Sequence, residues 1–279
     1  MTDSKSRNDT EHTIRELGSL FQSPRIAKLR KPNLVGVGAG RCATSYLFGL
    51  LQGSRDIYVT PVKEANYFGI HQHPFRRDGM TARDYALLFA SQSDQKYIAE
   101  ITPVYLGHPL ALRLIRVELG GIKLIVTLRN PVARFRSQFL YHRPQHKFDD
   151  ITAYAAHALQ RYIPETFNME WNTPEMALRM SRYSGGVRTA FELFGKENVV
   201  VLLYEDLLRD GTSWTRALEK FLGVTLPAEA EPNFRNRGPQ ADTDFDAAMR
   251  KRLIQFFKTD VIRLSQLLGK DMLSYWDLS

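Results

Sequence analysis

The sequence predicts an α/β fold: a single P-loop-like domain whose central, mainly parallel sheet is flanked by helices. Short apolar runs alternate with helical patterns along the chain, which is the order expected for a parallel sheet. A glycine-rich turn joins the first apolar run to the first helical pattern. The stretch GIKLIVTLRNP at 121–131 contains an apolar run that suits a strand buried on both faces.

The predicted elements follow one another in that order. A strand at 34–38 leads into a helix that opens at 45–51. Pro131 stands where a helix has its first turn. A long helical stretch through MALRMSRYSGGVRTAFELFG is expected to end at Gly195. The tail at 245–269 spaces its apolar residues at three and four, as an amphipathic helix does. The other strands are expected over IYVT at 57–60, KYIAE at 96–100, GIKLIVTLRNP at 121–131 and ENVVVLLYEDL at 197–207.

The composition of the 279 residues favours one large domain. No repeat or linker divides the chain, so residues 1–30 are interpreted as a polar basic arm and 31–279 as the domain. The net charge of +8 favours an anionic partner: nucleic acid, a membrane surface, or a phosphorylated or sulfated small molecule. The single cysteine, Cys42, excludes an internal disulfide. No apolar run approaches the roughly 18 residues that span a bilayer, and no secretory h-region is visible, so we expect a cytoplasmic protein without stable membrane insertion.

The stretch NLVGVGAGRCATSYLFGLL, residues 33–51, predicts an anion-binding loop. A strand, a glycine-rich turn and a helix N-terminus direct free backbone N–H groups and the helix dipole to one point. The glycines allow the backbone to approach an anion closely, the hydroxyls lie at the helix start, and the arginine adds a positive charge. These residues are Gly36, Gly38, Gly40, Arg41, Thr44 and Ser45.

Other phosphate loops fit this stretch less well. Counted from Gly36, the third glycine of a dinucleotide fingerprint falls on Arg41, and the frame fails. Counted from Gly38, GAGRCA fits the looser form that ends in alanine, but the next strand ends in threonine and proline rather than the ribose-binding acid. A Walker loop lacks its Gly-Lys-Ser/Thr. A tight turn packed for its own sake stays open.

A second stretch, KLIVTLRNPVARFRSQFLYH, adds a possible second phosphate site. It places Arg129 at the end of a predicted strand and Ser137 eight residues later, in the following helix. Ligands bind at the carboxyl ends of parallel strands. Arg129 and Ser137 are therefore candidates for holding a phosphate that the glycine loop does not reach, and an exposed strand-end arginine is the alternative.

The two stretches together resemble the cofactor motifs of the sulfotransferases that use 3′-phosphoadenosine 5′-phosphosulfate (PAPS). The family's first motif, near G-x-x-[KR]-x-G-T-[TS], corresponds to GAGRCATS here, and its second to LRNPVARFRS. Further segments resemble carbohydrate-type members of the family and extend the likeness over nearly the whole chain. They are VKEANYF at 62–68, EITPVYL at 100–106, VVVLLYEDLLRD at 199–210 and the closing LLGKDMLSYW.

The resemblance implies a role for each motif. The first loop would hold the 5′-phosphosulfate of PAPS, and the strand-end arginine and serine would hold the 3′-phosphate. The basic segment PNFRNRGPQ at 232–240 stands where relatives place a cofactor-closing loop. Tyr183 is expected to face the nucleotide or, alternatively, to pack within its helix. The cofactor-binding candidates are Gly38, Ala39, Gly40, Arg41, Cys42, Ala43, Thr44, Ser45, Arg129, Ser137, Tyr183, Arg235, Arg237 and Gly238.

Two positions depart from the family pattern. Many members have lysine where this chain has Arg41. An arginine keeps its proton, because its pKa stays above about 12, so Arg41 would act by charge alone. Ala43 replaces the usual glycine. If the backbone there has positive φ, the methyl group costs about 1 kcal/mol or more.

The reaction implied by the resemblance is in-line transfer of a sulfuryl group from PAPS to an acceptor hydroxyl, with release of adenosine 3′,5′-bisphosphate. Glu64 matches the general base of carbohydrate-type relatives, which favours a sugar or other aliphatic alcohol as acceptor. Arg41 is the second catalytic candidate, because it would stabilise charge on the leaving group. A solvated Lys63–Glu64 pair is the alternative for this position. No metal is expected, since His71, His73, His142 and His146 form no ligand cluster.

Three other functions compete with this one. Arg41 and Ala43 leave open a catalytically inactive nucleotide-binding relative. A small-molecule kinase is weakened by the missing Walker lysine, and nucleic-acid binding by the scattered basic residues. Tyrosine, phenol, lipid and polyketide acceptors stay open beside sugars. The stretch at 147–172 matches no motif, and the sequence indicates no oligomeric state.

Overall fold

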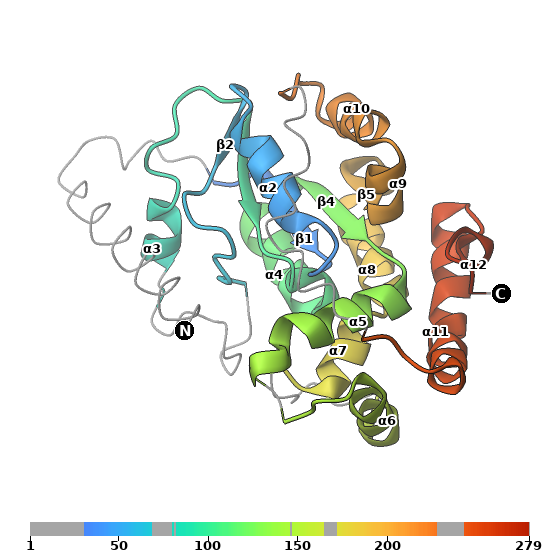
Figure 1. Ribbon diagram of the computed structural model, residues 1–279. Coiled ribbons are helices and arrows are strands. Elements are labelled where there is room, and N and C mark those ends of the chain that lie inside the picture. Colours follow the sequence, from blue (N-terminus) through green and yellow to red (C-terminus); the bar gives the residue numbers. More distant parts are fainter. Residues whose placement is uncertain are drawn as a thin grey trace.

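The fold is built on one parallel sheet of five strands in the order β2-β3-β1-β4-β5 (Figure 1). The computed structural model describes residues 31–68, 80, 82–145, 147–164, 172–227 and 243–278. The strands are β1 Leu34–Gly38, β2 Ile57–Val59, β3 Tyr97–Ile101, β4 Lys123–Leu128 and β5 Val199–Leu203. All four strand pairings are parallel, which confirms the predicted fold class.

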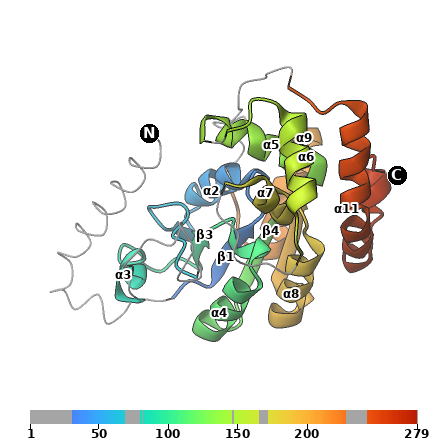
Figure 2. The same cartoon turned by 90° about the horizontal axis from the view of Figure 1, so that it is seen from below.

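Helices cover both faces of the sheet. On one face, α2 (Thr44–Gln52) and α10 (Gly211–Leu222) pack on alternate strand residues such as Leu34 and Ile125. On the other, α4 (Pro109–Leu119) and α8 (Ser184–Phe194) lie side by side over Val35 and Val126 (Figure 2). Successive residues of a central strand therefore contribute to two separate cores, which explains its continuous apolar run.

Most of the remaining helices lie around the α8 side of the sheet and along its carboxyl edge, whereas α3 lies toward the β2 end of the sheet (Figures 1 and 2). The long helix α11 packs against α8 and carries α12 at its end. Their bounds are α3 Ala82–Leu87, α5 Pro131–His142, α6 Ile151–Arg161, α7 Pro174–Met180, α9 Tyr204–Arg209, α11 Ala247–Leu268 and α12 Met272–Tyr275, with short 3₁₀ turns η3 Tyr105–Gly107, η4 Arg143–Gln145 and η5 Lys196–Asn198.

Helix α5 begins as the sequence predicts, with Pro131 in its first turn. The Asn130 side chain accepts from the N–H groups of Val132 (3.0 Å) and Ala133 (3.1 Å), which caps the helix. The Asn130 N–H donates to Glu205 Oε1 (2.8 Å). The strand end that precedes α5 is therefore tied to the residues that follow β5.

Two predicted elements are wrong in extent. The long helical stretch before Gly195 is two helices, α7 and α8, because the chain turns at residues 181–183 and Asp260 accepts from the N–H groups of Tyr183 (2.7 Å) and Ser184 (3.3 Å). The strand predicted over 197–207 ends at Leu203, where α9 begins. The acidic residues of the YEDL segment therefore lie on a helix, where Glu205 is free to accept from Asn130.

Candidate active site

The turn between β1 and α2 forms a narrow backbone cradle. Gly38 has φ 129°, and a Cβ at this position would overlap the carbonyl oxygen of Pro103. The Ala39 N–H donates to the Thr127 carbonyl (2.6 Å), which ties the turn to β4. Glycine is therefore required at position 38 both by the backbone angle and by the close approach of the chain after β3.

Helix α2 starts without a capping side chain. Its N-cap is Ala43, whose φ of 66° and ψ of 23° are left-handed and which makes no side-chain cap hydrogen bond. No acidic residue stands in the first turn. The positive end of the helix dipole thus points at the turn without a carboxylate beside it, which favours an anion there. The positive φ anticipated for Ala43 is present, and with it the strain of a methyl group in this region.

Arg41 brings the two predicted motifs together. Its Nε donates to Ser137 Oγ (3.4 Å), and its guanidinium lies 4.0 Å from the centre of the Tyr141 ring. Ser137 and Tyr141 are one turn apart on α5. Burial lowers the pKa of Arg41, Tyr141 opposes that shift, and the nearby charges of Arg134 and Arg129 add to it. Three guanidinium groups therefore gather beside the cradle.

Arg134 is the member of this group that the sequence analysis missed. Its side chain is 2% exposed, and its Nε donates to the Gly40 carbonyl (3.0 Å). Its Nη1 donates to the Ala177 carbonyl (2.9 Å) and to Ser181 Oγ (3.0 Å). Burial lowers the pKa of Arg134. This arginine therefore links the cradle to α7 and fixes the position of the turn.

Arg129 lies where it was predicted, one residue beyond the end of β4. Its guanidinium is 4.5 Å from the centre of the Tyr204 ring. Tyr183 is buried, and its hydroxyl donates to the Arg129 carbonyl (2.9 Å), so its contacts are those of a packed tyrosine. Burial raises the pKa of the Cys42 thiol to about 11, which makes it a poor nucleophile.

Glu64 lies in the loop after β2, beside the same segment that meets the cradle. The Glu64 N–H donates to the Ile101 carbonyl (3.0 Å), and the Thr102 N–H donates to the Gly36 carbonyl (2.9 Å). The Glu64 residue has φ 67°, and its side chain is 45% exposed and paired with Lys63. Glu64 and the glycine loop thus flank residues 101–103 from opposite sides.

A buried carboxylate organises the loop that carries Glu64. Glu100 is fully buried and accepts from Thr102 Oγ1 (2.7 Å) and from the Tyr105 hydroxyl (2.8 Å). Each hydroxyl in turn accepts from a loop N–H: Thr102 Oγ1 from Asn66 (3.4 Å) and the Tyr105 hydroxyl from Phe68 (3.2 Å). A hydroxyl has one proton to donate. Because both protons go to Glu100, both oxygens are left to accept from the loop.

Burial raises the pKa of the Glu100 carboxyl above its usual value, and the hydroxyl groups that donate to it partly offset that rise. The pKa values of Tyr85 and Tyr105 are raised well above the usual value, first by burial and then by the Glu100 charge. The tyrosines therefore keep their protons and remain donors to the carboxylate.

Comparison with known proteins shows what this chain is similar to. A family model described as the sulfotransferase domain matches residues 107–237. A sulfotransferase from Alicyclobacillus acidocaldarius is 27% identical, with a TM-score of 0.69 over 89% of this chain and 99% of its own. The chain is therefore similar to the sulfotransferases, in sequence over residues 107–237 and in fold over most of its length. Its α/β architecture is shared with a solved sulfotransferase structure.

A curated relative supports the same family over a shorter segment. The membrane-associated sulfotransferase kil1 of Dictyostelium discoideum is 31% identical over 110 residues, which is 39% of this chain and 22% of that protein. The match thus spans about a fifth of the length of the curated relative. In the part of this protein that the structure describes, every helix is too short or too polar to cross a membrane.

The structure describes most of the predicted site residues and leaves some outside. Thr44 is buried and Ser45 exposed at the start of α2, beside Ala39, Gly40 and Cys42 in the turn. Arg235, Arg237 and Gly238 lie outside the described residues, as do His71, His73 and His146. Among the residues that are described, no three of His, Cys, Asp and Glu are grouped as metal ligands would be.

Proposed function

We propose that this protein is a sulfotransferase that uses PAPS and transfers its sulfuryl group to an acceptor hydroxyl. The observation that supports the proposal best is the hydrogen bond from Arg41 to Ser137, which joins the glycine loop to α5. The donor set suits a doubly phosphorylated nucleotide, because Arg41, Arg129 and the uncapped start of α2 gather around one turn. PAPS would supply the activated sulfuryl group.

Each arginine of the cradle would have a different role in nucleotide binding. Arg41 and the first N–H groups of α2 lie where the phosphosulfate end would bind, and they would stabilise charge on the departing phosphate oxygen. Arg129 and Ser137 would hold the 3′-phosphate. Arg134 is buried and donates to the Gly40 carbonyl. It would preserve the shape of the turn without touching the nucleotide.

Glu64 is the proposed general base. Its carboxylate would take the proton of the acceptor hydroxyl, whose oxygen then forms the new bond to sulfur as the bond to the leaving phosphate oxygen breaks. Lys63 is the ion-pair partner of Glu64, and it would turn toward an anion when Glu64 receives the substrate. The Glu64 segment favours an aliphatic hydroxyl, with a sugar as the first class to test.

Two observations favour a second function, a nucleotide-binding relative without catalysis. The left-handed φ of Ala43, at 66°, strains the turn on the nucleotide side, and the Lys63–Glu64 pair occupies the proposed base. The small-molecule kinase has no such support. The cytoplasmic location and the division at residue 30 stay predictions.

The test of the proposed function is transfer of labelled sulfate from PAPS to a panel of sugars, aliphatic alcohols, phenols and tyrosyl peptides. The proposal expects transfer to at least one aliphatic hydroxyl and a loss of about 10²–10⁴-fold in kcat in Glu64→Gln. Lys63→Gln is the matched control, because it breaks the same ion pair but keeps the carboxylate. Nucleotide binding without transfer to any acceptor would favour the non-catalytic relative.

A further inference from the structure

The peptide group that joins Arg129 to Asn130 is held at both of its polar atoms by side chains. It lies just beyond Leu128, where the pairing of β4 with β5 ends. Its carbonyl, which belongs to Arg129, accepts from the Tyr183 hydroxyl (2.9 Å). Its N–H, which belongs to Asn130, donates to Glu205 Oε1 (2.8 Å). Because a peptide group is planar, these two hydrogen bonds fix the orientation of the backbone beside the Arg129 side chain.

Trp276, the residue that follows α12, contacts each of the groups in this arrangement. Its Nε1 donates to Glu205 Oε2 (3.0 Å), so the two oxygens of one carboxylate connect the indole to the Asn130 N–H. The Trp276 carbonyl accepts from Asn130 Nδ2 (2.8 Å). Its ring centre lies 6.2 Å from that of Tyr183. A residue 146 positions after Asn130 therefore contacts both side chains that hold the peptide group.

The position of Trp276 is itself fixed by its surroundings. Met272, at the start of α12, is fully buried. The Tyr275 hydroxyl donates to Oδ1 of Asp206 (2.5 Å), the residue after Glu205 on α9. Trp276 is 3% exposed, which leaves almost none of its surface for contact with a nucleotide. Any influence of Trp276 on a ligand must therefore pass through the residues around it.

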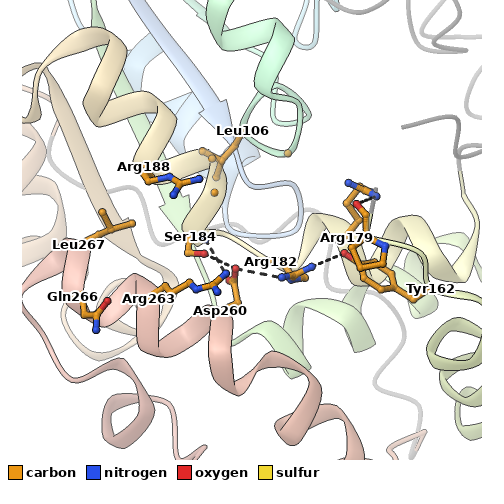
Figure 3. Close-up of a pocket in the computed structure, with 14 residues that line it drawn as sticks. Leu106, Tyr162, Arg179, Arg182, Ser184, Arg188, Asp260, Arg263, Gln266 and Leu267 are labelled. Carbon is orange, nitrogen blue, oxygen red and sulfur yellow. Dashed lines mark hydrogen bonds and ion pairs between the residues drawn. The ribbon is translucent and has the colours of Figure 1, made fainter. Parts of the chain in front are cut away.

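The backbone of Tyr183 is held from α11. The Asp260 carboxylate accepts from the Tyr183 N–H (2.7 Å) and from the Ser184 hydroxyl (2.6 Å). Ser184 and Asp260 lie in the wall of a pocket, with their side chains directed toward one another (Figure 3). The Tyr183 hydroxyl thus reaches the Arg129 carbonyl from a fixed backbone, and the Trp276 ring restricts the movement of the tyrosine ring.

The Arg129 guanidinium depends on the same part of α9. It lies 4.5 Å from the centre of the Tyr204 ring, and Tyr204 is the residue before Glu205. A shift of Glu205 would therefore disturb both the peptide group after Arg129 and the ring against which its guanidinium lies. A guanidinium binds phosphate in bidentate fashion only when its plane is correctly oriented.

We propose that Trp276 is a positioning residue for Arg129, and that it thereby sets the preference of the nucleotide site for a 3′-phosphate. The inference rests on the proposed function, in which Arg129 holds that phosphate. The indole keeps Glu205 on the Asn130 N–H and Tyr183 on the Arg129 carbonyl. Arg129 is then presented to the phosphate in one orientation, at little cost in conformational freedom on binding.

The experiment is calorimetric titration of Trp276→Phe with adenosine 3′,5′-bisphosphate and with 5′-AMP. The measured quantity is the ratio of the two affinities, which reports the contribution of the 3′-phosphate. A loss of folded protein lowers both affinities by the same factor and leaves the ratio unchanged. Phenylalanine keeps a ring beside Tyr183 but has no N–H for Glu205. We expect the ratio to fall about three- to tenfold, less than in Arg129→Ala, because the guanidinium is still present.

Trp214→Phe is the matched control. Trp214 is also 3% exposed, but it lies on α10, and its Nε1 has no hydrogen-bond acceptor among the residues that the structure describes. This variant removes the same atoms from a buried site and should leave the ratio unchanged. Equal falls in the two tryptophan variants would overturn the inference, since lost packing would then explain both.

Glu205→Gln tests the same connection from the other side. Glutamine has one acceptor oxygen, whereas two N–H donors face this side chain, so the ratio should fall here too. In an Arg129→Ala background, Trp276→Phe should leave the ratio unchanged, because its effect passes through Arg129. A further fall in that background would overturn the inference.

The unaltered chain separates this inference from the proposed function. If it binds the bisphosphate no more tightly than 5′-AMP, the proposed function fails and the inference fails with it. If it prefers the bisphosphate and Trp276→Phe keeps the full preference, the inference alone is overturned.

Discussion

The glycine cradle and the Glu64 loop lie on either side of residues 101–103, but they are held in different ways. The cradle is fixed by its own backbone, through Gly38 and the left-handed Ala43, and by the buried Arg134. The Glu64 loop follows the three-residue edge strand β2 and is fixed by hydroxyl groups oriented by Glu100. Nucleotide binding should therefore depend on the backbone geometry of the turn, and catalysis on the buried Glu100 network that positions the Glu64 loop.

The largest effect is expected in the cradle, from Gly38→Ala. The new Cβ would overlap the Pro103 carbonyl oxygen, and alanine disfavours the φ of 129°. We expect a loss of roughly 3 kcal/mol in the free energy of unfolding together with loss of nucleotide binding. Denaturant unfolding and calorimetric titration would measure the two losses.

The matched control for this change is Gly49→Ala on α2. A Cβ there meets nothing within 4 Å, and alanine is the better helix former, so the variant should gain about 0.5–1 kcal/mol. If Gly38→Ala unfolds no more easily than the unaltered chain, the close approach of the turn to Pro103 is not what fixes the cradle.

The next effect separates the Glu64 loop from the cradle. Tyr105→Phe removes the hydroxyl that both donates to Glu100 and accepts from the Phe68 N–H. We expect kcat to fall about tenfold, because the loop loses about one hydrogen bond of positional support. The affinity for adenosine 3′,5′-bisphosphate should not change, since the cradle is untouched.

Tyr85→Phe is the control for that prediction. The Tyr85 hydroxyl also donates to Glu100, but the bridges to Asn66 and Phe68 run through Thr102 and Tyr105. This variant should lose stability and keep its kcat. Equal falls in kcat in the two variants would mean that the network stabilises the core without positioning the loop.

A smaller effect is expected at the contact between the cradle and α5. Tyr141→Leu removes the ring that stacks on Arg41 at 4.0 Å. Tyr141 is 49% exposed, and a cation–π contact at such a site contributes about 0.5–1 kcal/mol. Affinity for adenosine 3′,5′-bisphosphate should fall about threefold. An unchanged affinity would show that Ser137 alone suffices to orient Arg41.

The smallest effect is expected from Ala43→Gly. Glycine relieves the left-handed strain at φ 66°, while its greater freedom in the unfolded chain offsets part of the gain. We expect the free energy of unfolding to rise by about 0.5 kcal/mol, measured by denaturant unfolding. A fall would indicate that the Ala43 methyl group makes compensating contacts in the turn.

The parts of the site that follow local rules could be predicted from the sequence. The strand-to-helix turn, the place of Arg129 at the end of β4 and the helix start at Pro131 all follow from short-range patterns. The buried Arg134 could not be predicted, because nothing in VARFRS shows that one of its two arginines meets backbone carbonyls in the folded chain.

Contacts between distant segments were also beyond the sequence. The bond from Arg41 to Ser137 joins residues 96 positions apart, and the division between α7 and α8 depends on Asp260 from α11. The EITPVYL segment resembled the family, yet its physical role becomes visible only when Thr102 and Tyr105 meet the Glu64 loop. Long-range hydrogen bonds therefore define this site as much as its motifs do.

The central claim is that the cradle binds a nucleotide with a 3′-phosphate. The measurement that tests it most directly is calorimetric titration with adenosine 3′,5′-bisphosphate beside ATP and 5′-AMP, repeated with Arg129→Ala. The account predicts tight binding of the bisphosphate alone, weakened by on the order of 10–100-fold in Arg129→Ala as a charged hydrogen bond is lost. Equal binding of ATP, or no binding of the bisphosphate, would contradict it.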